Sequence, residues 1–199
     1  MIIRTLDFCF SLLFILLFIP IFIILSFLIL LSSKGGVFYV QKRVGQHNID
    51  FKLLKFRTMR VGADQKGLLT VGDKDPRVTR IGQFLRKFKL DELPQFINVL
   101  KGDMSIVGPR PEVRKYVDQY TEQQKRVLTV KPGITDYASL LYIDENELLA
   151  KSSDPEKCYL EEVMPAKIKL NFKYIDNKSV REYVKVIFLT AQSIFLNRA

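Results

Sequence analysis

Residues 86–112 read RKFKLDELPQFINVLKGDMSIVGPRPE, and acidic and basic side chains are concentrated in this stretch. Two adjacent carboxylates, Asp91 and Glu92, precede an apolar pattern of helical spacing that ends at Gly102. We predict a short helix with Asp91 as its N-cap and Pro94 in its first turn, where backbone amides have no intrahelical partner. Its predicted buried stripe consists of Leu93, Phe96, Ile97 and Leu100.

The pair of carboxylates has two interpretations. In the structural one, Asp91 caps the helix and Glu92 complements the positive end of the helix dipole. In the functional one, the helix N-terminus and the nearby Arg86 keep the Asp91 carboxylate ionised, which a carboxylate nucleophile requires. The residues alone leave both interpretations open.

Arg110 lies between two prolines in the turn Gly108-Pro109-Arg110-Pro111. Proline restricts its own φ and the conformation of the residue before it, so the backbone of Arg110 loses little freedom on binding. A guanidinium held in this way could bind two oxygens of a phosphate at once. The alternative is a salt bridge between Arg110 and either Glu112 or Asp103.

Composition limits the classes of protein that this chain can be. Its 31 Lys and Arg residues against 21 Asp and Glu residues give a net charge of +10, which suits a membrane surface, a nucleic acid or a phosphorylated substrate. The single histidine, His47, argues against a His-rich metal site and against a Ser-His-Asp triad. Cys9 and Cys158 lie in unlike contexts, so neither a disulfide framework nor a cysteine metal site is indicated.

The N-terminal region predicts a membrane segment. Residues 8–31 contain no charged side chain, and 24 residues at about 1.5 Å per residue are long enough to cross a bilayer core. The run is too long for a cleaved signal peptide and lacks a cleavage site after it. Lys34, Lys42 and Arg43 after the segment outweigh Arg4 before it, which predicts a cytoplasmic globular part.

Pro20 interrupts this segment near its middle, where it removes one backbone hydrogen bond. One interpretation is a kinked helix that spans the membrane, which membrane helices tolerate. The other is a re-entrant hairpin of two half-helices that enters and leaves on the same face. The residues alone favour the spanning helix.

Two strands and a loop are expected next, at residues 37–41, 49–59 and 62–76 respectively. The second strand carries Lys55 and Arg57 among aromatic residues. This interleaving is found in proteins that bind nucleic acid, and it equally suits a half-buried strand whose cations extend to solvent.

The rest of the chain is expected to be mainly helical. From Val78 to Lys89 an apolar face alternates with basic residues, as in a helix at an anionic bilayer surface or one that directs cations at a phosphate. The fold class is therefore α+β and mostly helical: a membrane helix in residues 1–33, broken at Pro20, and a domain in residues 34–199 with a short sheet and interfacial amphipathic helices. Further elements are a strand at 105–107 and helices at 112–120, 121–128, 145–151, 154–175 and 180–196.

Four long runs carry a resemblance to a known family. KFRTM (55–59), DPRVTRIG (75–82), LDELPQFINVLKGDMSIVGPRPE (90–112) and KPGIT (131–135) resemble the bacterial sugar transferase family, the monotopic polyprenyl-phosphate phosphoglycosyl transferases, in its minimal single-domain form. The resemblance implies transfer of sugar-1-phosphate from a UDP-sugar to undecaprenyl phosphate with release of UMP. This is the first membrane step of glycoconjugate assembly, on the cytoplasmic face of the bacterial inner membrane.

The resemblance also implies roles for individual residues. Asp91 would be the nucleophile that forms a covalent phosphosugar intermediate, and Asp91 and Glu92 would hold Mg²⁺. Arg86 and Arg110 match the phosphate-binding arginines of the family, and the basic motif of the second strand would add two further phosphate contacts, Lys55 and Arg57. Family members carry a re-entrant helix broken at a Ser-Pro pair, so the resemblance favours the hairpin, although Ile19 replaces the serine here.

Beyond Thr135 the chain departs from the commonest family pattern, because residues 136–139 read DYAS and tryptophan is absent. We therefore expect a variant subgroup and predict neither the sugar, the glycan pathway nor the oligomeric state. Expected partners are the two substrates, membrane lipid and other glycan-assembly enzymes, without nucleic acid. The alternative is a membrane-anchored module that binds anionic lipid or nucleic acid without catalysis, which leaves the acidic pair and the Pro-Arg-Pro turn without a purpose.

Overall fold

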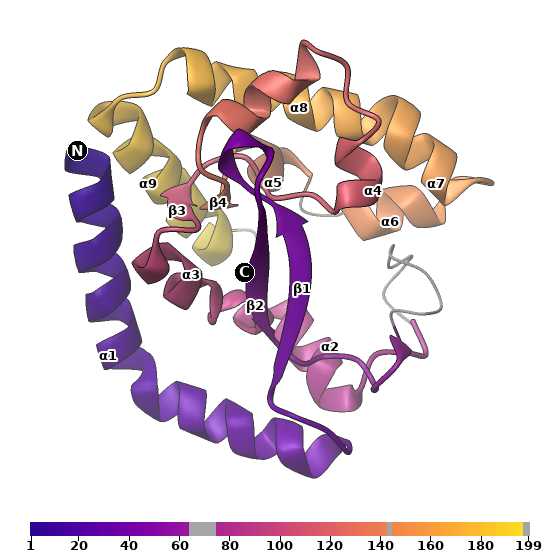
Figure 1. Cartoon of the computed structure of the whole chain (residues 1–199). Coiled ribbons are helices and arrows are strands. Elements are labelled where there is room, and N and C mark those ends of the chain that lie inside the picture. Colours follow the sequence, from indigo (N-terminus) through magenta and orange to yellow (C-terminus); the bar gives the residue numbers. More distant parts are fainter. Residues whose placement is uncertain (64–74, 143–144, 197–199) are drawn as a thin grey trace.

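The computed structural model describes residues 1–63, 75–142 and 145–196. The protein is mostly helical, and a long N-terminal helix runs around one side of a body that contains the strands and the other helices (Figure 1). This confirms the predicted α+β class, with two small sheets in the described part instead of one. The predicted surface loop at residues 62–76 falls largely outside the described residues.

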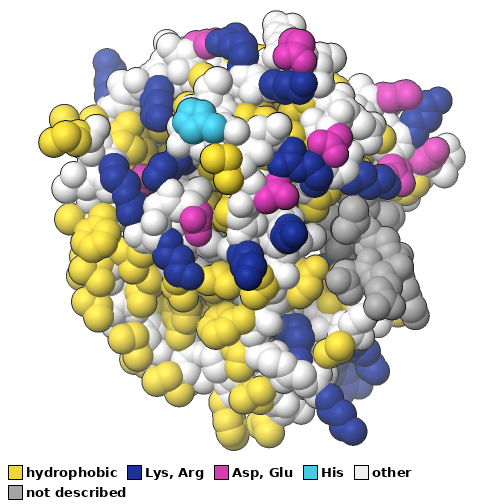
Figure 2. All heavy atoms as spheres, viewed as in Figure 1, with side chains coloured by type: hydrophobic (Ala, Val, Ile, Leu, Met, Phe, Trp, Pro, Cys, Tyr) yellow, Lys and Arg dark blue, Asp and Glu magenta, His cyan; other side chains and the backbone are white. Residues whose placement is uncertain are grey.

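Helix α1 (Ile2–Ser32) is, within the described ranges, the one helix that is long and apolar enough to cross a membrane. It contains Pro20, and Figure 1 shows that the helix changes direction near its middle. Since proline cannot donate to the carbonyl four residues earlier, a bend here has a physical cause. Most of its apolar side chains are exposed, and Figure 2 shows hydrophobic side chains gathered along the edge of the molecule where α1 lies.

Strands β1 (Phe38–Val44) and β2 (Asp50–Phe56) form an antiparallel hairpin at the centre of the body (Figure 1). The two predicted strands are confirmed, although the first extends to Val44 and the second ends at Phe56, before the predicted end at residue 59. The register pairs Phe38 with Phe56 and Val44 with Asp50. Phe56 is buried against Leu25 and Ile29 of α1, so the β1–β2 hairpin packs against the second half of α1. This contact places the end of β2 beside the second half of α1.

Helix α2 (Arg80–Lys87) begins at Thr79, whose hydroxyl accepts a hydrogen bond from the amide of Gly82 at 3.0 Å. A 3₁₀ turn (Leu90–Glu92) follows, and then α3 (Gln95–Lys101), which ends at Gly102 with φ of 92°, as predicted. The prediction of Asp91 as N-cap is wrong. The helix begins later, with Pro94 in the N-cap position and no side-chain cap.

The predicted buried stripe of α3 is only partly buried, and the most deeply buried side chains of the helix include polar ones. Asn98 donates to the carbonyl of Lys52 at 2.7 Å and accepts from the amide of Leu54 at 2.9 Å. These bonds fix α3 to β2, while the half-buried Phe96 stacks on Phe14 of α1 with ring centroids 3.9 Å apart. Helix α3 thus lies between the hairpin and the membrane helix, and periodicity cannot reveal two such different neighbours.

Strands β3 (Ser105–Val107) and β4 (Gly133–Thr135) pair in parallel. Further helices follow the order α4 (Arg114–Val117), a 3₁₀ helix (Gln124–Thr129), α5 (Tyr137–Leu141), α6 (Glu145–Ala150), α7 (Pro155–Cys158), α8 (Met164–Asp176) and α9 (Val180–Leu196). A π-helical turn joins α7 to α8, so the predicted long helix continues past Pro165. The predicted helix at residues 112–120 is shorter, with only α4 formed.

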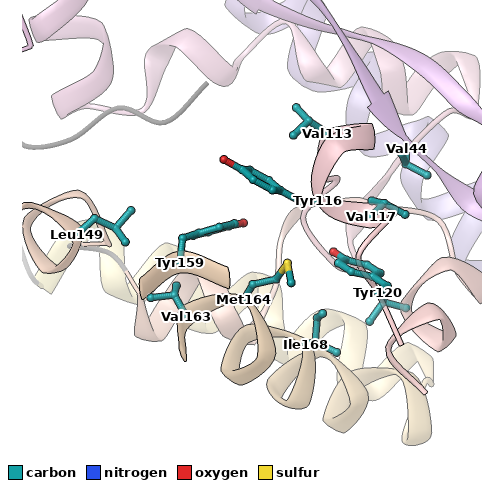
Figure 3. Close-up of a cluster of buried hydrophobic side chains, with 11 residues drawn as sticks. Val44, Val113, Tyr116, Val117, Tyr120, Leu149, Tyr159, Val163, Met164 and Ile168 are labelled. Carbon is teal, nitrogen blue, oxygen red and sulfur yellow. The ribbon is translucent and has the colours of Figure 1, made fainter. Parts of the chain in front are cut away.

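Two predicted helix starts and the bonds of one predicted capping box are confirmed, although the helix at the capping box is a 3₁₀ helix that begins only at Gln124. Asp154 accepts from the amide of Lys157, Ser179 accepts from the amide of Glu182, and Thr121 and Gln124 exchange the two bonds of a capping box. The residue before the predicted helix at 145–151 lies outside the described residues, so the start of that helix is not tested. Figure 3 shows one buried cluster, between α4 and the α7–α8 region, that holds these helices together. Its members include Val113, Tyr116, Val117, Tyr120, Leu149, Tyr159, Val163, Met164 and Ile168.

Candidate active site

Glu92 is the electrostatic centre of the site. It lies in the 3₁₀ turn before α3, and Lys55 of β2 donates to its Oε1 at 3.2 Å. Arg110 donates to Oε2 at 3.2 Å and, through its second amino group, to Oε1. Three segments that are distant in sequence therefore meet at one carboxylate, and its side chain is only 13% exposed.

These contacts determine the charge of Glu92. Burial alone would raise the pKa of Glu92, but Arg110 and Lys55 hold that pKa well below its usual range. Burial lowers the pKa of Lys55, which Glu92 opposes, and the charge of Glu92 raises the pKa of Arg110. Glu92 is thus a fixed anion held between two cations.

Asp91 has the opposite character. It is 8% exposed, and within the described part of the chain its carboxylate has no hydrogen bond or ion pair. Burial raises the pKa of Asp91, and the charge of Glu92 adds to the increase, while Lys55 and Arg86 oppose it. Asp91 does not cap α3, so the expected stabilisation of its ionised form by the helix N-terminus is not found, whereas Arg86 does favour the ionised form, as expected. Two adjacent carboxyl groups with opposite pKa shifts are typical of residues with separate chemical roles.

Arg86 lies on the Asp91 side of the pair. Its Nε donates to the hydroxyl of Thr58 at 2.9 Å, and burial lowers its pKa while the charge of Asp91 raises it. Gly82 permits this arrangement, because a Cβ there would lie 2.0 Å from the carbonyl oxygen of Thr58. Sequence reasoning missed Thr58 and Gly82, although both lie inside the runs that carry the resemblance.

Arg57 does not join the acidic pair. Its guanidinium donates to the carbonyls of Ser33 at 2.8 Å and Lys34 at 3.0 Å, at the end of α1. Gly35 has φ of 122°, and a Cβ there would lie 1.9 Å from Arg57 Nη1, so the turn requires glycine. Of the two cations in the predicted strand 49–59, Lys55 lies on β2 and reaches the site, whereas Arg57 follows the end of β2 and binds the end of α1.

The turn that carries Arg110 is fixed by a hydrogen bond to β4 and by close packing against it. The amide of Gly133 donates to the carbonyl of Pro109 at 3.0 Å, and a Cβ on Gly133 would lie 2.1 Å from the amide nitrogen of Gly108. Asp136, which is 1% exposed, accepts from the amide of Arg110 at 3.2 Å and caps α5 through the amide of Ser139. Sequence reasoning missed Asp136, although an aspartate between a strand and a helix is typical of an N-cap.

The salt bridges proposed for Arg110 with Glu112 or Asp103 are not the ones formed. Glu112 lies 3.6 Å from Arg43 and accepts a hydrogen bond from Tyr159, and Asp103 accepts from Asn98 at 3.1 Å. Arg110 does form a salt bridge, but with the acidic pair itself. The structural and functional interpretations of this arginine are consequently not exclusive.

The acidic pair is also the place where a metal ion would fit. The described residues contain no group of three or more His, Cys, Asp or Glu side chains that could hold one. Mg²⁺ needs no such group, because it commonly binds through one or two carboxylates and takes its other ligands from water and substrate phosphates. Asp91, whose carboxylate has no protein donor in the described ranges, and its neighbour Glu92 suit that mode of binding.

Comparison with known proteins gives consistent results. The sequence profile of a family described as bacterial sugar transferase matches residues 1–197. The chain is 39% identical over 181 residues to the UDP-N-acetylgalactosamine-undecaprenyl-phosphate N-acetylgalactosaminephosphotransferase of Aeromonas hydrophila, covering 89% of this chain and 40% of that protein. It is 37% identical over 199 residues to the UDP-glucose:undecaprenyl-phosphate glucose-1-phosphate transferase of Escherichia coli K12, covering 98% and 40% respectively.

A third relative is nearer to this chain in length. The exopolysaccharide production protein ExoY of Rhizobium meliloti is 31% identical over 198 residues, which cover 92% of this chain and 80% of that protein. By contrast, the chain spans about two fifths of the length of the Aeromonas and Escherichia relatives.

Proposed function

Because the chain belongs to the bacterial sugar transferase family, we propose that it moves sugar-1-phosphate from a UDP-sugar to undecaprenyl phosphate and releases UMP. The names of the two longer relatives support the acceptor and the kind of donor. The observation that carries the proposal is the difference between the two carboxyl groups: Glu92 is an anion held between two cations, and Asp91 has no protein partner in the described part of the chain. The pair also lies next to the membrane helix, because Leu90 and Leu93 on either side of it pack with Leu25 and Ile29 of α1.

In the proposed reaction an oxygen of the Asp91 carboxylate attacks the phosphorus that carries the sugar. The bond from that phosphorus to the bridging oxygen breaks, and UMP leaves with the electron pair. An oxygen of undecaprenyl phosphate then attacks the same phosphorus and displaces Asp91, which restores the free carboxylate. Each step exchanges one P–O bond for another, so no oxidant or reductant is needed.

The surrounding residues support these two steps in different ways. A carboxyl group with a raised pKa is more basic once ionised, and basicity favours attack on phosphorus. Arg86, near Asp91, and Arg110, whose side chain is 35% exposed, can bind phosphate oxygens as charge moves during transfer. Glu92 keeps Arg110 and Lys55 in place, since both donate to its carboxylate.

Mg²⁺ is the proposed cofactor, and Asp91 and Glu92 are the residues that would hold it. Its chemistry would be to neutralise negative charge on the diphosphate. The fit rests on the two carboxyl groups described above.

We also propose that α1 enters and leaves the membrane on one face, with residues 34–199 on the cytoplasmic face of the bacterial inner membrane. Both ends of α1 contact the same body: Arg4 bonds to α3 near the start, and Ser33 accepts from Arg57 at the end. A straight helix of 31 residues would be about 46 Å long and would separate its ends by more than the ~30 Å hydrocarbon core. The bend at Pro20 and the contacts of both ends of α1 with the same body support the re-entrant arrangement of α1.

The test is UMP release by purified protein with Mg²⁺, undecaprenyl phosphate and a panel of UDP-sugars, including UDP-N-acetylgalactosamine and UDP-glucose. We expect release that depends on the lipid acceptor with at least one donor. Absence of UMP with every donor would refute the proposed reaction.

The covalent step has its own test. With donor alone, the intact mass of the protein should increase by one sugar phosphate, and Asp91→Asn should abolish both this increase and turnover. Asp154→Asn, which alters a helix cap on α7 instead, is the matched control and should retain both. An adduct that persists in Asp91→Asn would assign the nucleophile to another residue.

A further inference from the structure

The Pro-Arg-Pro turn has an attachment to strand β1 that the proposed reaction does not use. Pro109 and Pro111 have no amide hydrogen, so hydrogen bonds can fix the turn only through carbonyl oxygens or through the amide of Arg110. Strand β4 donates to the carbonyl of Pro109, and Asp136 accepts from the amide of Arg110. The carbonyl of Pro111 accepts from Nη1 of Arg43 at 3.0 Å.

The guanidinium of Arg43 is itself held in one orientation. Its Nε and Nη2 donate to Oε1 of Gln41 at 3.0 Å and 2.8 Å, and its Nη1 lies 3.6 Å from Oε2 of Glu112. Glu112 is fixed in turn, because its carbonyl accepts from the amide of Val44 at 2.9 Å and its carboxylate accepts from the hydroxyl of Tyr159. Since all three nitrogens of this planar group have partners, Arg43 gives the turn a fixed point on β1.

Arg43 and Lys55 lie on the same face of the β1–β2 hairpin. Opposite residues of an antiparallel pair share a face, and side chains alternate along each strand. Lys55 is opposite Tyr39, and Arg43 lies four residues after Tyr39 on the same strand. One face of the hairpin therefore carries both the lysine that donates to Glu92 and the arginine that donates to the turn of Arg110.

Burial makes the attachment by Arg43 costly to lose. The side chains of Arg43 and Glu112 are 19% and 13% exposed, and burial lowers the pKa of Arg43 while the charge of Glu112 opposes that shift. Removing the guanidinium would take away the charge that balances Glu112 and the donor to the buried Pro111. The turn would then shift, and the two bonds from Arg110 to Glu92 depend on where the turn lies.

We propose that Arg43 is a positioning residue for the transfer of sugar-1-phosphate. It fixes the Pro-Arg-Pro turn, so that Arg110 presents its guanidinium to Glu92 and to the substrate phosphate in one geometry, and Glu112 balances the charge of Arg43. The inference rests on the proposed reaction, and it adds a residue that acts through Arg110 without binding the substrate itself.

The test measures the rate and the final amount of the sugar-phosphate adduct separately. Purified Arg43→Gln is mixed with Mg²⁺ and a UDP-sugar that the parent protein accepts, without lipid acceptor, and its intact mass is followed over time. We expect the adduct to form about tenfold or more slowly than in the parent, and to reach a similar final amount. A variant that was only partly folded would instead form less adduct at the rate of the parent.

The matched control is Arg114→Gln. It also removes an arginine that binds the β1–β2 hairpin, but the partner of Arg114 is Asp50 at the start of β2. This variant should keep both the rate and the final amount of the parent. The value of kcat for UMP release with undecaprenyl phosphate provides the same comparison between the two variants.

A double-mutant cycle identifies the residue through which Arg43 acts. If Arg43 positions Arg110, then Arg43→Gln should slow the reaction by about threefold or less when Arg110→Lys is already present, because the fork that it positions is gone. Arg43→Lys keeps a positive charge beside Glu112 and one donor for the turn, so its rate should lie between those of the parent and Arg43→Gln. Arg43→Lys is carried through the same cycle, so the cycle gives a result even if Arg43→Gln does not fold.

The outcomes separate this inference from the proposed reaction. A rate for Arg43→Gln within about threefold of the parent, or equal losses with and without Arg110→Lys, would refute the inference and leave the reaction intact. If the parent forms no adduct and releases no UMP with any donor, the reaction and the inference that rests on it are both refuted.

Discussion

Replacing Arg110 with lysine tests whether the forked contact with Glu92 matters or only its charge. Arg110 donates to both oxygens of Glu92, and a lysine ammonium would keep the charge but not this planar pair of donors. A hydrogen bond to a charged group contributes about 1.5–3 kcal/mol. The Arg110 side chain is 35% exposed, so solvent screening favours the lower part of that range, about 1.5–2 kcal/mol.

If this loss is felt in the transition state, kcat/KM for UMP release should fall about 10- to 30-fold. The assay uses undecaprenyl phosphate and a donor that the parent protein accepts, over a range of donor concentrations. Urea unfolding of the same preparation establishes that the variant remains folded. A variant within threefold of the parent would refute the reasoning from fork geometry.

A double-mutant cycle locates the effect. If Arg110 acts through Glu92, the loss in Arg110→Lys should shrink when Glu92→Gln is already present, with a coupling of about 1 kcal/mol or more. Additive losses would mean that the two residues act independently, in spite of their contact.

Two further predictions concern stability and helix placement. Burial raises the pKa of Asp91 above its usual value of 3.8, so the ionised form of Asp91 destabilises the folded state at pH values above the folded pKa. Asp91→Asn should therefore increase the free energy of urea unfolding at pH 7, and this gain should vanish below about pH 3.8. A lower free energy of unfolding at pH 7 in the variant would contradict the raised pKa. Gly82→Ala should displace α2 from Thr58, destabilise the protein by about 1–3 kcal/mol and reduce UMP release. The control is Gly36→Ala, which should change neither stability nor UMP release, because no atom lies within 4 Å of the added Cβ. Equal behaviour of the two variants would refute the role of the close approach between Gly82 and Thr58.

Local patterns determined much of this protein from the sequence alone. The uncharged run of α1, the presence of strands β1 and β2, the capping-box bonds of Thr121 and Gln124 and the helix starts at Asp154 and Ser179 follow from patterns of a few residues. Hydrogen bonds of this kind are made by near neighbours in the chain, so a sequence pattern is sufficient to predict them. The site residues came from the motifs that carry the family resemblance.

The electrostatic roles in the site were decided only by tertiary structure. Asp91 is not a helix cap but a buried carboxyl group with a raised pKa, while Glu92 is the anion held by cations from two distant segments. Lys55 and Arg57 are two residues apart, yet one reaches the acidic pair and the other reaches the end of α1. Arg57 lies just past the end of β2, and its destination is decided by the packing of the end of α1 against that segment.

The same distinction between local sequence pattern and tertiary packing applies to the contacts of α1. Hydropathy alone predicts that α1 enters a membrane, and Pro20 indicates where it can bend. That Asp7 meets a tyrosine 176 residues away is a result of packing among α1, β3 and α9. Local propensity acts over a few residues, and only the folded chain brings the donors for such a buried carboxylate together.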